Sequence, residues 1–127
     1  MKIRTVLFAL WTLMLLGLLL SPLRDNILPT FGGFQHWDKV AHFGLFAVTG
    51  FISIYGAGFF SRFGARVLFG LIFGLALAVG TELGQYFIPF RDPDYYDLLA
   101  DLAGLFLGLL FYALLYSYDM LRSRLRL

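Results

Sequence analysis

Residues 82–101 read ELGQYFIPFRDPDYYDLLAD, and this stretch joins two long apolar segments of the chain. It contains five of the eight acidic residues and the only arginine between Arg66 and Arg122. Glu82 and Asp101 lie inside the apolar segments themselves. An ionisable group near the centre of a membrane helix costs about 2.5–3.5 kcal/mol on insertion scales, and such groups usually have a function. We therefore expect this stretch to lie where membrane meets water and to hold functional residues.

The composition on either side of this stretch is that of a membrane protein. Apolar residues make up 60% of the 127 residues and charged residues 14%, against about 45–50% and about 25% in soluble domains. A soluble helical core would need polar stripes at helical period, and the apolar runs have none. A spanning helix needs roughly 20 mostly apolar residues. The sequence therefore predicts one all-α domain over residues 1–127, an integral membrane four-helix bundle with spans near residues 5–23, 40–60, 67–88 and 98–118.

The basic residues predict an orientation for this bundle. Seven of the ten lie before the first expected span, between the second and third, or after the fourth. With four spans these three regions share one side of the membrane, and the positive-inside rule places that side in the cytoplasm. We therefore expect both termini inside and the two acidic connections outside.

Two features narrow the class of protein further. Lys2 and Arg4 precede an apolar run, as in a signal peptide, but residues 20–24 (LSPLR) contain no small-x-small cleavage site, so we expect a helix. The absence of cysteine excludes disulfides and thiolate metal sites. Nothing in the sequence supports nucleic-acid binding.

Polar residues recur at the outer ends of the second, third and fourth expected spans. His42 follows Lys39 by three residues and Asp101 follows Asp97 by four, so each pair shares a helix face. In a tight bundle these faces should converge in one outward-open polar pocket. The candidate binding residues are Asp38, Lys39, His42, Glu82, Gln85, Arg91, Asp94, Asp97 and Asp101.

Several of these residues also have simpler interpretations. Asp38 and Asp97 each fit a helix N-cap. Arg91 lies among acidic residues, which fits a surface ion pair of little energetic value or a guanidinium that binds phosphate or carboxylate. A lone histidine such as His42 is usually a hydrogen-bonded packing residue. Glu82 lies about 10 Å below the outer helix end, so it must be protonated, hydrogen-bonded or paired inside the bundle.

Small residues predict close packing of the third and fourth expected spans. Gly70 and Gly74, and again Gly80 and Gly84, are four residues apart, a spacing that lets helix backbones approach each other. Gly104 and Gly108 extend a similar stripe. The alternative use of these faces is a homo-oligomer interface.

The combined pattern resembles the VanZ-like family of small membrane proteins over about residues 38–112. Asp101 departs from it, since most members are expected to have Asn there, which argues against a role that needs a neutral amide. The matching residues are Asp38, Lys39, His42 and Phe43 in the first part and Glu82, Gln85, Pro89, Arg91, Asp94, Asp97 and Gly104 in the second.

The resemblance implies a multi-pass protein of the bacterial cytoplasmic membrane, and the family's namesake is associated with resistance to teicoplanin, a lipid-bearing glycopeptide that targets envelope precursors. Our first hypothesis is a protein that binds an anionic lipid-linked envelope component or a lipidated glycopeptide. Lys39 and Arg91 would bind the anionic headgroup. The second is an intramembrane hydrolase or transferase, and the third is an assembly partner of an envelope complex.

The enzyme hypothesis has no established catalytic motif behind it. Its candidate acid, base or catalytic groups are His42, Glu82, Asp97 and Asp101. A metal-dependent enzyme would have His42, Glu82 and Asp101 as its candidate ligands. Two histidines, with His36 in a connection, would be a thin metal shell, so we expect no cofactor and no metal. Membrane lipid is the expected partner in the first hypothesis.

Overall fold

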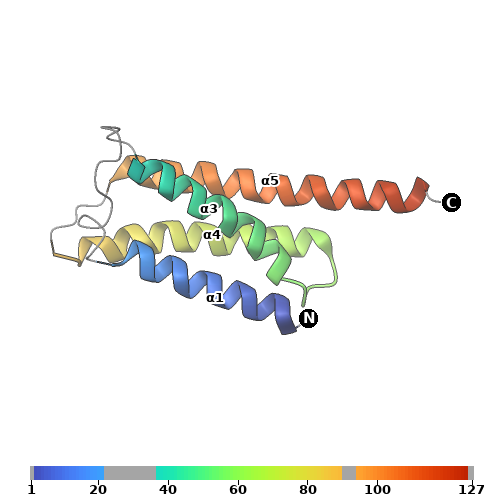
Figure 1. Ribbon diagram of the computed structural model, residues 1–127, viewed down its shortest axis with the longest axis horizontal. Helices are drawn as coiled ribbons and strands as arrows, with labels where there is room; N and C mark the ends of the chain where they lie inside the picture. The colour runs from blue at the N-terminus through green and yellow to red at the C-terminus, as the bar shows by residue number, and fades with distance from the viewer. Residues whose placement is uncertain (1, 22–36, 90–93, 126–127) are drawn as a thin grey trace.

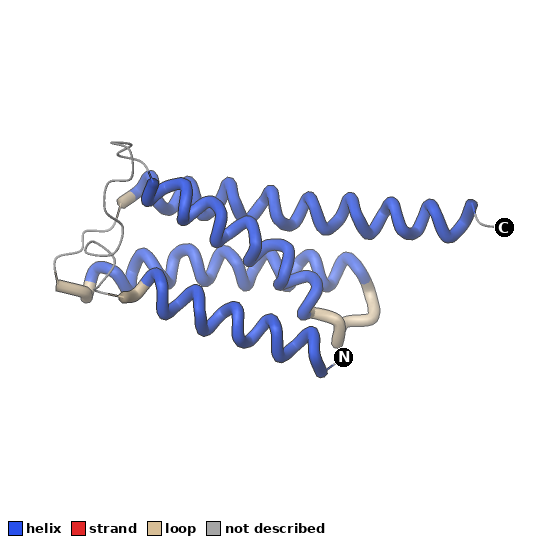
Figure 2. The backbone as a smooth tube through the Cα atoms, viewed as in Figure 1, coloured by secondary structure: helices blue, strands red, loops and turns tan. Residues whose placement is uncertain are grey.

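The computed structural model describes residues 2–21, 37–89 and 94–125. Within these ranges the chain forms four helices and no strand, which confirms the predicted all-α fold (Figure 1 and Figure 2). The helices are α1 (Lys2–Leu19), α3 (Trp37–Gly56), α4 (Phe63–Tyr86) and α5 (Tyr95–Leu125).

Three of these helices, α3, α4 and α5, are long and apolar enough to cross a membrane. The first, α1, is 18 residues long, at the lower end of the roughly 17–25 residues that a spanning helix needs. The helices alternate in direction along the bundle, so both termini lie at the end that holds the α3–α4 connection (Figure 1).

All four helices begin three or four residues earlier than the hydropathy pattern predicted. In α3 and α5 the added first turn holds an acid, which the expected spans excluded and which interacts favourably with the helix dipole. The first turns of α1 and α4 hold no acid. Asp38 and Asp97 both lie inside first turns. The prediction that they are N-caps is therefore wrong. Three helices also end earlier than predicted: α1 at Leu19, α3 at Gly56 and α4 at Tyr86.

Helix α5 is much longer than predicted and extends beyond the other helices at its C-terminal end (Figure 1). Its 31 residues correspond to about 46 Å at about 1.5 Å per residue, against roughly 30 Å for a hydrocarbon core. Tyr116 still stacks on Phe63 with ring centroids 4.0 Å apart. Beyond Tyr116 the described residues are exposed, and they include Asp119, Arg122 and Arg124, which would project into the membrane surface or water.

The most extensive helix contact is between α3 and α5, and glycines on both helices make it possible. A methyl group at Gly104 would overlap the carbonyl oxygen of Phe43, and one at Gly108 would overlap that of Ala47. Gly50 lies against the α5 backbone in the same way, with the amide nitrogen of Leu109 2.9 Å from where a Cβ would be. The absence of side chains at these positions therefore brings the two backbones together.

The glycines of α4 do not all pack as their spacing predicted. A Cβ at Gly74 would meet Leu105, and one at Gly84 would meet Leu20, but Gly80 has nothing within 4 Å. Gly80 and Gly84 therefore do not form one contact surface within the bundle, and a homo-oligomer interface stays a prediction. The buried apolar core that these contacts enclose comprises Leu15, Leu19, Phe46, Ile54, Ala78, Leu105 and Leu109.

Candidate functional site

The first turns of α3 and α5 and the last turns of α4 lie at one end of the bundle (Figure 1). Polar residues of these turns contact one another there. We call this region the acidic end. It is opposite the end with the α3–α4 connection, where Arg62 precedes α4 and Arg66 lies in the first turn of α4. The acidic end contains Asp38, Lys39, His42, Glu82, Asp94, Asp97 and Asp101.

Asp94 is the N-cap of α5, a role that the sequence interpretation had given to Asp97. Its Oδ1 accepts the backbone N–H of Tyr96 at 2.8 Å, and its carbonyl oxygen accepts those of Asp97 and Leu98. The available sequence signal was an aspartate directly before the helix with a second acid three residues later, which is typical of a helix start. The side-chain oxygen and the carbonyl oxygen of Asp94 thus accept hydrogen bonds from amide groups that otherwise have no partner at a helix terminus.

Lys39 of α3 bridges two carboxylates of the α5 start. Its Nζ donates to Asp94 Oδ2 at 2.6 Å and to Asp97 Oδ1 at 3.0 Å. The hydrogen bond from Lys39, together with the N–H of Tyr96, holds the pKa of Asp94 below its ordinary value. The Asp94 side chain is 40% exposed and that of Asp97 only 7%, so one carboxylate of the bridge faces outward and the other is enclosed.

His42 and Asp101 form a buried pair between α3 and α5. The Nδ1 of His42 lies 2.8 Å from Asp101 Oδ1, and neither side chain has exposed surface. The Nε2 of the same ring lies 3.8 Å from Asp97 Oδ2. This contact joins the polar faces of α3 and α5, which the sequence analysis expected to converge.

Glu82 of α4 is inside the bundle, as its depth in the apolar segment predicted. Its Oε2 accepts the backbone N–H of Asp94 at 3.2 Å, and the residue is 8% exposed. Its Oε1 is buried, and no residue in the described ranges donates a hydrogen bond to it. Glu82 thereby fixes the backbone at the start of α5 with one oxygen and leaves the other oxygen unsatisfied.

Two predicted site residues lie elsewhere or outside the described residues. Gln85 is fully buried, but its Nε2 donates to the carbonyl oxygen of Leu19 at 3.1 Å, so it joins α4 to the end of α1. Arg91 belongs to residues 90–93, which lie outside the described ranges. The proximity of Arg91 to His42 therefore stays a prediction.

The acidic end is more enclosed than the expected outward-open pocket. His42 and Asp101 are fully buried, and Glu82 and Asp97 nearly so. Lys39 and Asp94 provide the partly exposed polar surface, with side chains 29% and 40% exposed. The described residues of the acidic end therefore form a buried polar cluster with partly exposed members at its surface.

Two groups of side chains at the acidic end could hold a metal ion, and both include His42. One consists of Asp38, His42 and Asp97, and the other of His42, Glu82 and Asp101. In each group one ligand atom per residue lies within 4.8 Å of the others. Of the five residues in the two groups, only Asp38 is half-buried and the others are buried.

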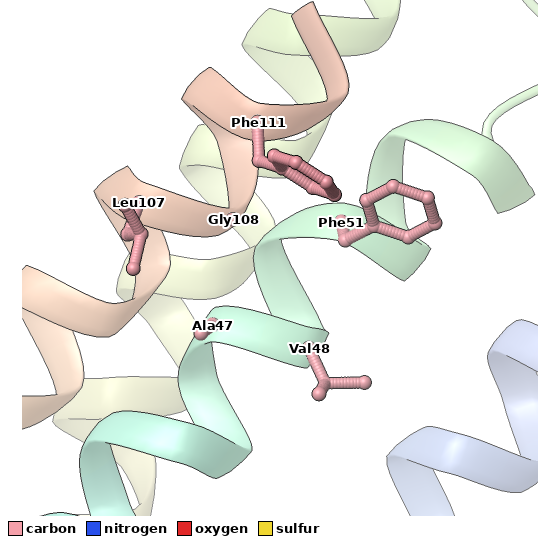
Figure 3. Close-up of a pocket in the computed structure, with 6 residues that line it drawn as sticks. All are labelled: Ala47, Val48, Phe51, Leu107, Gly108 and Phe111. Carbon is pink, nitrogen blue, oxygen red and sulfur yellow. The ribbon is translucent and has the colours of Figure 1, made fainter. Parts of the chain in front are cut away.

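An apolar groove of about 420 Å³ runs along the α3–α5 pair below the acidic end (Figure 3). Ala47 follows His42 by five residues and Leu107 follows Asp101 by six, which places the groove roughly 7–9 Å deeper along the helices. Figure 3 shows the rings of Phe51 and Phe111 at one end of it. The sequence analysis missed this groove, because apolar lining residues look the same as core or lipid-facing ones before the helices are packed. Its lining residues are Ala47, Val48, Phe51, Leu107, Gly108 and Phe111.

Comparison with known proteins gives one match. A family model described as VanZ/LLP1 matches residues 3–116, which extends the resemblance found in the sequence to α1 and to most of α5. No curated protein and no solved structure matches the chain.

Proposed function

The chain belongs to the VanZ/LLP1 family, and three of its helices are long and apolar enough to cross a membrane. We propose that it is a multi-pass protein of the bacterial cytoplasmic membrane and that it binds an anionic amphiphile of the cell envelope. The ligand class is a lipid-linked envelope precursor or a lipidated glycopeptide. Its acidic head would bind at Lys39 and its hydrocarbon chain would lie in the apolar groove of α3 and α5.

The observation that carries the proposal is the bridge of Lys39 between one enclosed and one exposed carboxylate. Asp97, almost fully buried, holds the ammonium group in place from one side. Asp94, 40% exposed, holds it from the side that an incoming ligand can reach. A phosphate or carboxylate head would replace Asp94 on Lys39 without releasing Asp97, and an ammonium that is already positioned loses little conformational entropy on binding.

The groove supports the same proposal from the apolar side. It lies on the same helix pair as Lys39, and its lining residues carry almost no polar groups at its surface. An amphiphile with its head at the acidic end would place its chain along this part of α3 and α5, at a depth where hydrocarbon is expected. Head and chain would then contact one continuous helix pair.

Arg91 provides the second cation of the proposal on sequence grounds alone. It lies between Glu82 and Asp94 in the chain, and its planar guanidinium matches phosphate oxygens bidentately, which a lysine ammonium cannot do. Arg91→Lys should therefore weaken head binding while leaving the melting temperature unchanged.

Native mass spectrometry of the full chain in detergent tests the proposal with phosphatidylglycerol and phosphatidylcholine as probes. We expect preferential binding of the anionic lipid, with occupancy at least about three-fold lower in Lys39→Gln and reduced in Arg91→Lys. Arg62→Gln is the matched control, because it removes one exposed positive charge at the opposite end. Equal occupancy in Lys39→Gln and Arg62→Gln, or no preference for the anionic lipid, would contradict the proposal.

The buried His42–Asp101 pair is the one observation that favours an acid/base enzyme instead. A carboxylate that orients a histidine is common in general-base catalysis, and the 2.8 Å contact fits that arrangement. Both side chains are fully buried, however, so a substrate would need the bundle to open.

Susceptibility to teicoplanin of cells that express the wild-type chain or Lys39→Gln tests whether lipid binding has a link to resistance.

A further inference from the structure

Three metal-ligating side chains from three different helices meet below Lys39. His42 comes from α3, Glu82 from α4 and Asp101 from α5, and one ligand atom of each lies within 4.8 Å of the other two. His42 and Asp101 are fully buried, and Glu82 is 8% exposed. We infer that these three residues form a binding site for a divalent first-row transition-metal cation.

The first argument is the like charge of the two carboxylates. One carboxylate oxygen of Glu82 lies within 4.8 Å of one of Asp101, and both residues are buried, so water screens their repulsion poorly. Two carboxylates that share a buried site can both be ionised only if a cation lies beside them, and otherwise one of them holds a proton. A divalent cation neutralises both groups at once.

The second argument is the unsatisfied oxygen of Glu82. The Oε2 atom accepts the Asp94 N–H, and this hydrogen bond fixes the carboxylate at the start of α5. The Oε1 atom is buried, and nothing in the described part of the chain donates to it. Buried polar atoms are nearly always paired, so an exception indicates an unseen ion, water or proton.

The ligand set selects the class of cation. One imidazole and two carboxylates suit Zn²⁺ or Mn²⁺ better than Ca²⁺, which takes six to eight oxygen ligands. Bonds of about 2.0–2.2 Å place the ligand atoms of a tetrahedral ion roughly 3.4 Å apart. The 2.8 Å contact of His42 with Asp101 would therefore open slightly, and atoms up to 4.8 Å apart would move closer by up to about 1.4 Å. Three protein ligands leave a fourth position for water or a ligand oxygen.

The alternative group of Asp38, His42 and Asp97 is the weaker candidate. It competes for the same histidine, and Asp38 is only half-buried. Asp97 is already bonded to Lys39 at 3.0 Å. In the site we infer, Asp97 instead lies behind the histidine ring, 3.8 Å from Nε2, where a carboxylate often orients a metal-ligating histidine.

This inference does not depend on the proposed lipid binding, because its test measures the metal alone. The full-length chain, purified in detergent, is titrated with Zn²⁺ and with Mn²⁺ by calorimetry, and its metal content is measured by mass spectrometry before and after chelation. We expect about one equivalent of cation per chain and a melting temperature that rises on metal addition, since a ligand that binds only the folded state stabilises it.

Variants locate the site. Glu82→Gln and Asp101→Asn should each weaken binding at least tenfold, whereas Asp119→Asn, in the exposed end of α5, should leave it unchanged. Glu82→Gln distinguishes a metal site from a Glu82 that is simply protonated. An amide can take the place of a neutral carboxyl group, but it is a poor metal ligand. Size-exclusion chromatography and circular dichroism show whether each variant is folded.

Co²⁺ binding to the wild-type chain adds a readout that needs no variant, since its visible absorption reports the coordination number. An absence of metal binding by the wild-type chain overturns the inference. So does wild-type affinity in a folded Glu82→Gln variant, or loss of binding in Asp38→Asn with retention in Glu82→Gln.

Discussion

At the residue scale, Asp94 connects the three helices of the acidic end. Its side chain caps α5 through Tyr96 and binds Lys39 of α3, and its backbone N–H binds Glu82 of α4. Three interactions of one residue therefore determine where α5 starts relative to its neighbours. Buried and capping interactions of this kind are individually modest, but together they specify a single arrangement.

Asp94 should make stability depend on pH. Its pKa is lowered in the folded chain by Lys39 and by the Tyr96 N–H, so the unfolded chain binds more protons between the two pKa values, and stability rises with pH there. The stabilisation is fully present above the ordinary aspartate pKa of about 3.9 and disappears as the pH falls through the folded pKa.

The variant that isolates this effect is Asp94→Asn, which keeps the cap but loses the ion pair. Melting temperatures in detergent should show wild type above the variant at neutral pH, and the difference should shrink below about pH 4. A difference that grows on acidification would show that another group dominates. Asp119→Asn is the matched control, because the Asp119 carboxylate that it removes is exposed.

At the element scale, the α3–α5 contact depends on residues that have no side chain. Gly104 and Gly108 face the carbonyl oxygens of Phe43 and Ala47, and Gly50 faces the α5 backbone. Backbone atoms cannot rotate away as a side chain can, so an added methyl group must push the helices apart. This separation would also move His42 away from Asp101.

Gly108→Ala should therefore destabilise the bundle by about 1–3 kcal/mol, the usual cost of overpacking, less the gain of up to about 1 kcal/mol from replacing glycine in a helix. Gly80→Ala is the matched control, because nothing lies within 4 Å of the new methyl group, and it should be neutral or stabilising by up to about 1 kcal/mol. Unfolding in detergent with increasing denaturant measures both. Equal stability of the two variants would refute the close backbone contact.

At the scale of the whole molecule, the charges divide between the two ends of the bundle. The acidic end holds the carboxylates of the candidate site, and the opposite end holds Arg62 and Arg66, with Arg122 and Arg124 on the projecting part of α5. The figure places the termini at this basic end (Figure 1). Clusters of Lys and Arg favour the cytoplasmic side.

The basic end should therefore face the cytoplasm and the acidic end the outside. A reporter that is active only in the cytoplasm should be active when it is fused after Leu127. The same reporter inserted in the α3–α4 connection should also be active. Export of the C-terminal reporter would invert the topology and place Lys39 at the inner leaflet, where the proposed ligand class would no longer apply.

Much of the fold was predictable because its signals are local. Long charge-free runs identify membrane helices from composition alone, and spacings of three and four residues placed Lys39 with His42 and Asp97 with Asp101 on common faces. Helix boundaries were less predictable: α5 continues to Leu125, since hydropathy detects the hydrocarbon-spanning part of a helix and not its polar extension. Gln85 was misplaced because its spacing from Glu82 shows a shared face but not which neighbouring helix that face contacts.

The sequence by itself determined the class of the protein: an all-α membrane bundle of the VanZ/LLP1 family with ionisable residues inside its apolar segments. Only the tertiary structure decided that His42 pairs with Asp101, that Lys39 binds Asp94, and that a groove lies beneath them. Hydropathy and periodicity act over a few residues, whereas these contacts join positions up to 59 apart. Their geometry follows from how closely and at what rotation α3, α4 and α5 pack, which the glycine contacts between helices set.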